Sequence, residues 1–216
     1  MKLIIGLGNP GENYDHTRHN AGFAAIDFFR QNSNGFSEWQ NSAKFKAEIS
    51  EGEIDGPPSS ENFGRASQKI ILAKPQTLMN LSGQASRLLK DFYKMEISDI
   101  IVIHDDLDLA LGQLRLSQNS GSAGHKGVQS IIASLSSQNF GRIRLGIKPT
   151  SASPLYKGGL GGIFSKLFPK TPPEKFVLQK FSEEEMKIIN DVIEKSNQVL
   201  KTIITENFPS AMNKFN

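Results

Sequence analysis

A histidine and an aspartate in this chain have the side chains that hydrolytic enzymes use in pairs. His19 precedes an apolar helical stretch, within the run Thr-Arg-His-Asn at residues 17–20. Asp105 follows a very apolar run at residues 100–103. An imidazole can act as a general base near neutral pH, and a carboxylate can orient it and stabilise its protonated form. The sequence therefore offers a base and its orienter, although a solitary histidine is also compatible with an ordinary surface residue.

The run Gly-Leu-Gly-Asn-Pro-Gly at residues 6–11 follows an apolar strand pattern. Taken literally, it is the G-x-G-x-x-G fingerprint of dinucleotide-binding proteins. That fingerprint needs a helix after its last glycine, and residues 12–19 have no apolar helical stripe. Glu12 and Asp15 would also repel a phosphate. We therefore predict a tight turn that exposes Asn9, and a nucleotide-binding oxidoreductase is the weaker interpretation.

Three further segments place polar groups next to predicted elements. Asn80, in the polar turn after residues 69–75, either offers an amide to a ligand or caps the next helix. The aspartates at residues 104–108 either orient an imidazole or contribute to a metal site. The glycine-rich residues 121–127 open a helix, so their N–H groups either bind an anion or oxyanion or form an ordinary turn.

Strands and helices that alternate along the chain must position these groups. Apolar runs predict strands at residues 2–5, 45–49, 69–73, 100–103, 113–116 and 142–147. Helical spacing of apolar residues predicts helices after Asn20, which would cap the first of them, over 78–92 and 128–135, and after Ser182. The alternation predicts an α/β fold in which residues 1–216 form a single-domain sandwich, with a mixed twisted sheet flanked by helices.

Two segments rich in glycine, proline and serine, residues 51–67 and 148–173, are predicted to be mobile loops. Residues 142–147 alternate basic and apolar side chains, which is typical of a strand with one face in solvent.

Composition narrows the function classes. The chain has no cysteine, which excludes disulfides and thiolate zinc sites and suits a reducing compartment. Its first residues contain too short an apolar run for a signal peptide, and no stretch approaches the roughly 18 apolar residues of a membrane span, so we expect a cytoplasmic protein without a membrane partner. Residues 109–173 carry eight basic and no acidic side chains, which favours an anionic partner such as nucleic acid over a plain basic surface.

Taken in order, these segments resemble the bacterial-type peptidyl-tRNA hydrolase family over most of residues 1–148. The matching motifs lie at residues 6–11 with Tyr14, 17–20, 79–83, 104–108, 124–127 and 140–147. The resemblance implies a single α/β domain, usually a monomer, that hydrolyses the ester between a peptide and the tRNA ribose. It implies neither a metal nor a cofactor.

The resemblance also implies residue roles. His19 would activate the water, and Asp105 would orient His19. The residues that would hold the peptide or shape the cleft are Asn9, Tyr14, Met79, Asn80 and Lys126. Two basic residues, Arg115 and Arg142, fall where the family presents cations to tRNA phosphate.

One position departs from the family's pattern. Lys126 stands where the family commonly has asparagine, and an ammonium only donates hydrogen bonds whereas an amide also accepts them. Lys126 could stabilise negative charge but could not hold water as an amide does. The main alternative to an esterase is a non-catalytic RNA-binding relative on the same fold, although His19, Asp105, Asn9 and Asn80 are all present and favour catalysis.

Overall fold

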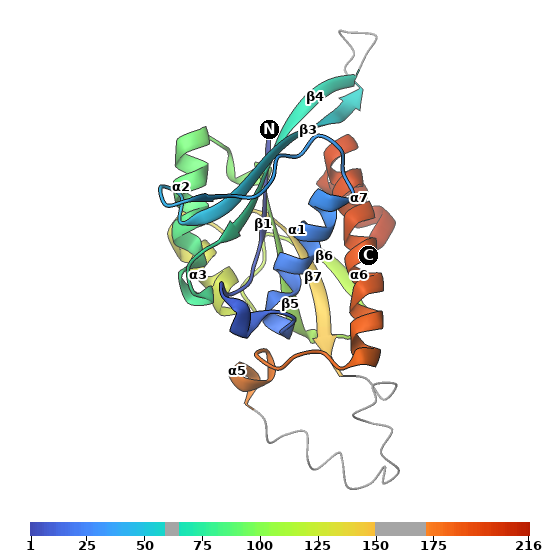
Figure 1. Cartoon of the computed structure of the whole chain (residues 1–216). Helices are drawn as coiled ribbons and strands as arrows, with labels where there is room; N and C mark the ends of the chain where they lie inside the picture. The colour runs from blue at the N-terminus through green and yellow to red at the C-terminus, as the bar shows by residue number, and fades with distance from the viewer. Residues whose placement is uncertain (59–64, 150–171) are drawn as a thin grey trace, which may run out of the picture.

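The computed structural model describes residues 1–58, 65–149 and 172–216. Within these ranges, seven strands form one sheet in the order β2-β3-β4-β1-β5-β7-β6. The four neighbouring strands β4, β1, β5 and β7 run parallel, and antiparallel pairs flank them on both sides. Helices cover both faces of this mixed sheet, which confirms the predicted α/β sandwich (Figure 1).

The elements alternate along the chain as the apolar pattern predicts. The strands are β1 (Lys2–Gly6), β2 (Gln40–Ser42), β3 (Ala47–Pro58), β4 (Arg65–Pro75), β5 (Ile100–Ala110), β6 (Leu114–Gln118) and β7 (Gly141–Lys148). The α-helices are α1 (Ala21–Gln31), α2 (Ser82–Tyr93), α3 (Lys126–Leu135), α5 (Pro173–Phe176), α6 (Glu183–Thr205) and α7 (Phe208–Phe215). Short 3₁₀ turns are η1 (Glu12–Tyr14), η2 (Arg18–Asn20), η3 (Met79–Leu81) and η4 (Ile97–Asp99).

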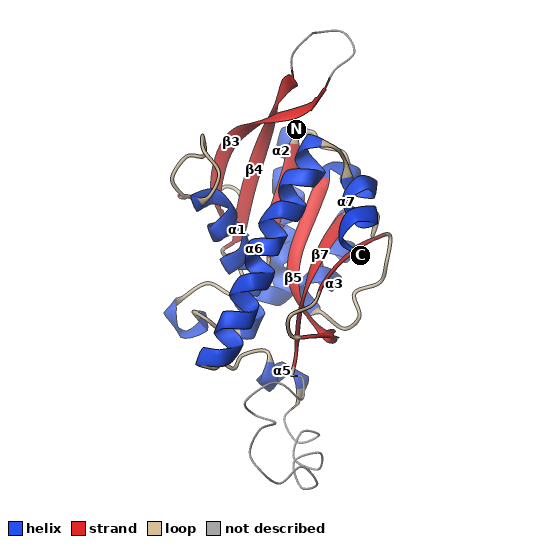
Figure 2. Cartoon of the chain, turned by 90° about the vertical axis from the view of Figure 1, so that its right-hand side faces the viewer, coloured by secondary structure: helices blue, strands red, loops and turns tan. Residues whose placement is uncertain are grey.

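Both faces of the central strands are buried. In β1, Ile4 packs toward α1 and α6, while Leu3 and Ile5 belong to the cluster under α2 and α3. Figure 2 shows α6 running along one face of the sheet, with α7 beside it. A strand covered on both sides is continuously apolar rather than alternating, which is why β1 and the start of β5 could be recognised from short apolar runs. Among the described residues, no helix is long and apolar enough to cross a membrane.

The long helix α6 begins as its sequence predicts. Ser182 accepts a hydrogen bond from the Glu185 N–H, and the Glu185 side chain accepts one from the Ser182 N–H. This reciprocal pair is a capping box, and it satisfies two backbone donors that the helix leaves without partners. The acidic run at residues 183–185 lies in the first turn, where its negative charges interact favourably with the positive end of the helix dipole.

A glycine in α1 determines how closely this helix approaches the sheet. A Cβ atom on Gly22 would lie 2.4 Å from the carbonyl oxygen of Ile103 and 2.5 Å from the Leu7 nitrogen. No larger residue fits there, so α1 begins directly against the ends of β1 and β5. His19 lies three residues before Gly22 and Asp105 two residues after Ile103, and the close approach brings the two side chains together.

The prediction of a loop over residues 51–67 is wrong for most of that segment. β3 and β4 form a long antiparallel hairpin that pairs from Ala47↔Pro75 to Pro58↔Arg65. Glycine and proline lie within the strands here because β3 has only the short β2 as its other neighbour, and near a sheet edge the lost packing and missing N–H donors cost less. Residues 59–64, and residues 150–171 of the second predicted loop, lie outside the described residues.

Candidate active site

The functional groups meet at the carboxyl ends of β4, β1 and β5. After β1 the chain forms β2, β3 and β4 on one side of this strand and then crosses to form β5 on its other side. Open α/β sheets bind ligands beside such a switch point. A cleft of about 710 Å³ opens there. All seven predicted catalytic and substrate-binding residues line it: Asn9, Tyr14, His19, Met79, Asn80, Asp105 and Lys126.

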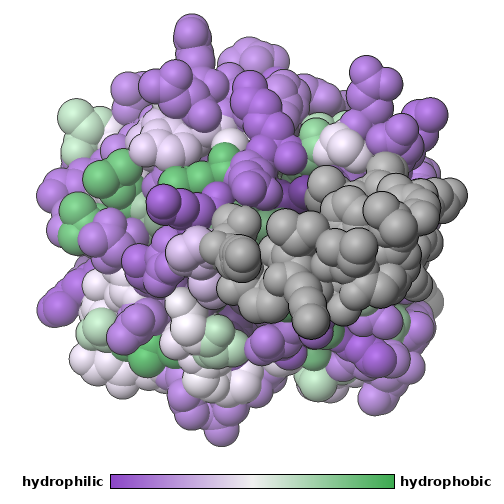
Figure 3. All heavy atoms as spheres, turned by 90° about the horizontal axis from the view of Figure 1, so that it is seen from below, coloured by the Kyte–Doolittle hydropathy of each residue, from purple (hydrophilic) through white to green (hydrophobic). Residues whose placement is uncertain are grey.

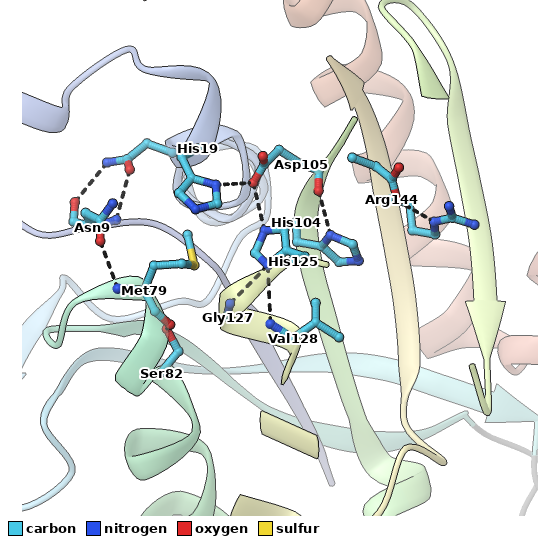
Figure 4. Close-up of polar contacts among 12 residues, drawn as sticks. Asn9, His19, Met79, Ser82, His104, Asp105, His125, Gly127, Val128 and Arg144 are labelled. Atoms are coloured by element: carbon cyan, nitrogen blue, oxygen red, sulfur yellow. Dashed lines mark hydrogen bonds and ion pairs between the residues drawn. The ribbon is translucent and has the colours of Figure 1, made fainter. Parts of the chain in front are cut away.

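His19 and Asp105 form the expected pair. His19 Nδ1 lies 2.8 Å from Asp105 Oδ1, and both residues are buried. A carboxylate only accepts hydrogen bonds, so Nδ1 carries the proton and donates it. In the neutral ring, Nε2 therefore has a free lone pair, and it lies on the side of the ring away from Asp105 (Figure 4). This is the tautomer that a general base requires.

His125 is a third member of this cluster, and sequence reasoning did not single it out as a site residue. Its Nε2 lies 2.9 Å from the same oxygen, Asp105 Oδ1. Its Nδ1 accepts from the N–H groups of Gly127 and Val128, at 3.1 and 3.3 Å, so the ring caps α3. Nδ1 therefore has no proton, and Nε2 must carry one to donate to Asp105. The sequence signals were the position of His125 directly before a predicted helix and its place in the motif at residues 124–127.

These contacts determine the charge of Asp105. Burial by itself would raise the pKa of this carboxyl, but the imidazoles of His19 and His125 lower it well below its usual range. Asp105 is therefore an anion throughout the physiological range. It can stabilise a positive charge that develops on His19 while water is deprotonated.

His104 adjoins Asp105 but is buried and does not line the cleft. Burial, and then the proximity of His125, lower the pKa of His104 to about 3. Its Nδ1 lies 2.7 Å from the Asp105 backbone carbonyl oxygen and donates to it, and its ring stacks edge-on against that of His125. His104 is thus a neutral support for the segment that carries the carboxylate.

Asn9 is held in one orientation at the floor of the cleft. Its Oδ1 accepts from the Met79 N–H at 2.8 Å, so its Nδ2 must be the group available as a donor. The Asn20 side chain bonds the backbone of Asn9 at two points: Oδ1 accepts from the Asn9 N–H, and Nδ2 donates to the Asn9 carbonyl. The prediction that Asn20 caps α1 is therefore only half right: it occupies the N-cap position, but its side chain makes no cap hydrogen bond.

Asn80 and Lys126 both line the cleft, and both are exposed. Asn80 lies inside η3, and α2 begins two residues later without a side-chain cap, so the capping alternative for Asn80 does not hold. The N–H of Gly127 is already bonded to His125, which removes one of the predicted oxyanion donors. Asn80, Asn9 and Lys126 are donor-bearing residues that line the cleft.

The expected tRNA contact of Arg142 does not fit its position. β7 is covered on both faces, contrary to the prediction of one solvent face, and Arg142 is 2% exposed. Its guanidinium donates to the carbonyls of Ser120 and Gly121 and to the Ser120 hydroxyl, and burial lowers its pKa. Arg115 is exposed on β6, away from the cleft lining, and donates to the backbone oxygen of Asn216.

The cluster has the residue types of a metal site. One ligand atom each from His19, Asp105 and His125 lies within 4.8 Å of the others. Ligation through His125 Nε2 would move its proton to Nδ1, which would then face two backbone N–H donors. The α3 cap therefore favours hydrogen bonding over metal binding at these three residues.

The chain is similar to proteins of one family along its whole length. The sequence model of a family described as Peptidyl-tRNA hydrolase matches residues 3–216. Proteins of that name from Bacillus cytotoxicus and Clostridium botulinum are each 40% identical, with all of this chain aligned to 100% and 96% of theirs. A crystal structure of peptidyl-tRNA hydrolase from Acinetobacter baumannii superposes with a TM-score of 0.78 at 30% identity, covering 100% of this chain and 94% of that one.

Proposed function

The chain belongs to the peptidyl-tRNA hydrolase family, and on that premise we propose that His19 is the general base of its reaction, oriented by Asp105. Its activity is hydrolysis of the ester between a peptide and tRNA. The observation that carries the role of His19 is the 2.8 Å contact from His19 Nδ1 to Asp105 Oδ1 at a cleft of about 710 Å³. It leaves Nε2 as the basic atom.

In the proposed reaction, Nε2 of His19 takes a proton from a water molecule while that water attacks the ester carbonyl. The imidazolium that forms is stabilised by the buried Asp105 carboxylate. As the tetrahedral intermediate collapses, the C–O bond to the ribose breaks, and the same proton passes to the leaving ribose oxygen. The products are a peptide acid and a tRNA with a free hydroxyl, and His19 returns neutral.

Three side chains are suited to bind the ester and its peptide. Asn9 presents Nδ2 because its Oδ1 is held by Met79, and a preoriented donor stabilises a developing oxyanion without reorganisation. Asn80 can both donate to and accept from a peptide backbone. Lys126 can add a positive charge beside the oxyanion. Met79 and Tyr14 shape the cleft walls.

The tRNA contacts follow from the basic residues that remain accessible. Of the two predicted arginines, only Arg115 is exposed, so the proposal keeps Arg115 for phosphate binding and does not extend to Arg142. We also propose that the protein acts as a monomer in the cytoplasm, since the seven predicted catalytic and substrate-binding residues already share one cleft within a single chain and the absence of cysteine suits a reducing compartment.

Hydrolysis of an N-blocked aminoacyl-tRNA, with EDTA present, tests this function. Wild type should release the blocked amino acid, while His19→Ala should lose roughly 100- to 10,000-fold in kcat and still bind tRNA. His16→Ala, a change of an exposed histidine, is the matched control. Near-normal turnover by His19→Ala would reject the base. Tight tRNA binding without any release by wild type would favour the RNA-binding alternative.

A further inference from the structure

Arg18, next to the proposed base, is a charged residue that the mechanism leaves unused. It is 1% exposed, one of the most buried large side chains among the described residues. Its Nη2 lies 2.6 Å from Oε2 of Glu185, which is itself fully buried. That same carboxylate oxygen closes the capping box of α6. Arg18 thereby ties the turn that carries His19 to the first turn of α6.

Two aromatic rings enclose the guanidinium. The Arg18 Cζ atom lies 4.6 Å from the ring centre of Phe176 and 4.8 Å from that of Phe181. Phe176 ends α5, and Phe181 lies in the link to α6. These are distances at which a cation is attracted by an aromatic face, and the planar guanidinium can stack on both rings while an ammonium cannot.

The segment held in this way is a wall of the catalytic cleft. Pro173, Glu174, Val177 and Leu178 line the same cavity as His19. The backbone makes the same connection, because the His19 N–H donates to the Val177 carbonyl at 2.8 Å and the Arg18 N–H to that of Gln179 at 3.0 Å. The α5 wall, which we define as residues 173–178, is thus attached to the base-bearing turn itself. Figure 1 shows α5 below the sheet.

Stability alone is a poor reason for this arrangement. Burying two charges costs several kcal/mol per ion by rough estimate, and a well-packed apolar set of similar volume is often as stable or more so. No described residue accepts a hydrogen bond from Arg18 Nε or Nη1, although both atoms are buried. What a rigid, planar, buried cation does supply is a fixed distance between the elements it touches.

We propose that Arg18 is a positioning residue that fixes the α5 wall relative to His19, so that substrate held by Leu178 on that wall is aligned with the base. Leu178 is suited to this contact because it is 44% exposed although apolar, and it lines the cleft. This inference rests on the proposed role of His19. If His19 were not the base, the kinetics of His19→Ala would reveal it. The experiment below does not use that variant, so the two proposals can fail independently.

A double-mutant cycle in kcat/KM on an N-blocked peptidyl-tRNA tests the coupling. Its variants are Arg18→Lys, which keeps the charge but loses the planar stack, Leu178→Ala, and both together. Leu78→Ala is the matched control, because Leu78 is a 53% exposed leucine that lines the same cleft but lies at the start of η3, outside the α5 wall. Urea unfolding of each variant reports stability separately.

We expect Arg18→Lys to lower kcat/KM roughly 10-fold, and Leu178→Ala to lower it several-fold in wild type but to add less than twofold after Arg18→Lys. Leu78→Ala should have the same effect in both backgrounds. Additive effects of Arg18 and Leu178 would overturn the proposal, as would equal coupling to Leu78. Leu178→Ala that changes nothing in wild type would also overturn it, since the wall would then hold no substrate.

A second variant keeps the test decisive if Arg18→Lys does not fold. Phe176→Leu removes one ring of the stack but leaves the ion pair of Arg18 with Glu185 in place. It should show the same non-additivity with Leu178→Ala and none with Leu78→Ala. Full additivity for Phe176→Leu would contradict the proposal.

Discussion

His19 and His125 donate hydrogen bonds to the same atom, Oδ1 of Asp105. Their ring centres are 4.9 Å apart. The two rings are not equivalent, because both line the cleft but His125 also accepts from the N-terminus of α3. Protonation of His125 Nδ1 would place a new N–H against two existing donors. A proton taken from water therefore goes to His19.

Exchange of His125 for asparagine separates its two contacts. Asparagine is a good N-cap and should keep α3 intact, but it is too short to reach Asp105. Asp105 then has one hydrogen-bond donor fewer, so its negative charge stabilises protonated His19 more strongly. The acid limb of kcat/KM should therefore move to higher pH. Loss of one of its two anchors should lower kcat roughly 10-fold.

His125→Ala is the control for the cap, because it removes both contacts and should cost about 1 kcal/mol more in stability than His125→Asn. A pH–rate profile that is identical in wild type and His125→Asn would show that the second donor does not influence the base.

We expect Lys126 to support the reaction through the positive charge of its ammonium group rather than through the shape of its side chain. Lys126→Met keeps most of the aliphatic length and should lower kcat/KM about 10-fold if the charge stabilises the oxyanion or a phosphate. Lys126→Asn should retain more activity, because an amide still donates. Steady-state kinetics at two salt concentrations checks this expectation. Equal activity of the methionine variant and wild type would contradict it.

Arg142 and Arg115 should behave differently when each is changed to alanine. Arg142 is itself buried and donates to two backbone carbonyls, so Arg142→Ala should lower the free energy of unfolding by about 2–4 kcal/mol and leave the salt dependence of tRNA binding unchanged. Arg115→Ala should leave stability almost unchanged and reduce the salt slope by about 1 if it contacts a phosphate. Urea unfolding and binding titrations in a salt series measure both quantities, and the reverse pattern would refute this division.

His104 should make the fold sensitive to acid. Its pKa is about 3 in the folded protein and near 6.5 in the unfolded chain, so the unfolded state binds the extra proton between these values. Stability is then fully present above pH 6.5 and is lost progressively as the pH falls toward 3, by an amount on the order of 4 kcal/mol.

His104→Gln keeps an amide donor and should flatten this part of the stability curve, as measured by urea unfolding at pH 4.5 and 7. His16→Gln, which changes an exposed histidine, serves as the comparison. If both variants follow the wild-type curve, His104 does not carry the acid sensitivity.

Surface hydropathy does not by itself mark the substrate. Seen from below, the described surface mixes polar and apolar side chains (Figure 3). The exposed leucines that matter, Leu78, Leu107 and Leu178, are recognised by their shared cleft rather than by their apolarity.

The sequence by itself determined the types of most elements, and it placed the reactive side chains in the turns next to them. Short apolar runs identified the central strands, and the acidic start after Ser182 located α6, because both depend on neighbouring residues. The residue types of His19, Asp105, Asn9 and Asn80 then indicated the chemistry. The extension of β3 and β4 into a long hairpin was missed because glycine and proline within residues 51–67 were taken as loop formers.

Only the tertiary structure decided which partners each side chain has. His125 lies 20 residues from Asp105 and Arg18 lies 167 residues from Glu185, and no local pattern encodes such contacts. Burial on both faces of β7 likewise turned Arg142 from an expected phosphate ligand into a support for residues 120–121. Local propensity fixes where a side chain stands along the chain, whereas its proton, its charge and its accessibility depend on the atoms that packing brings around it.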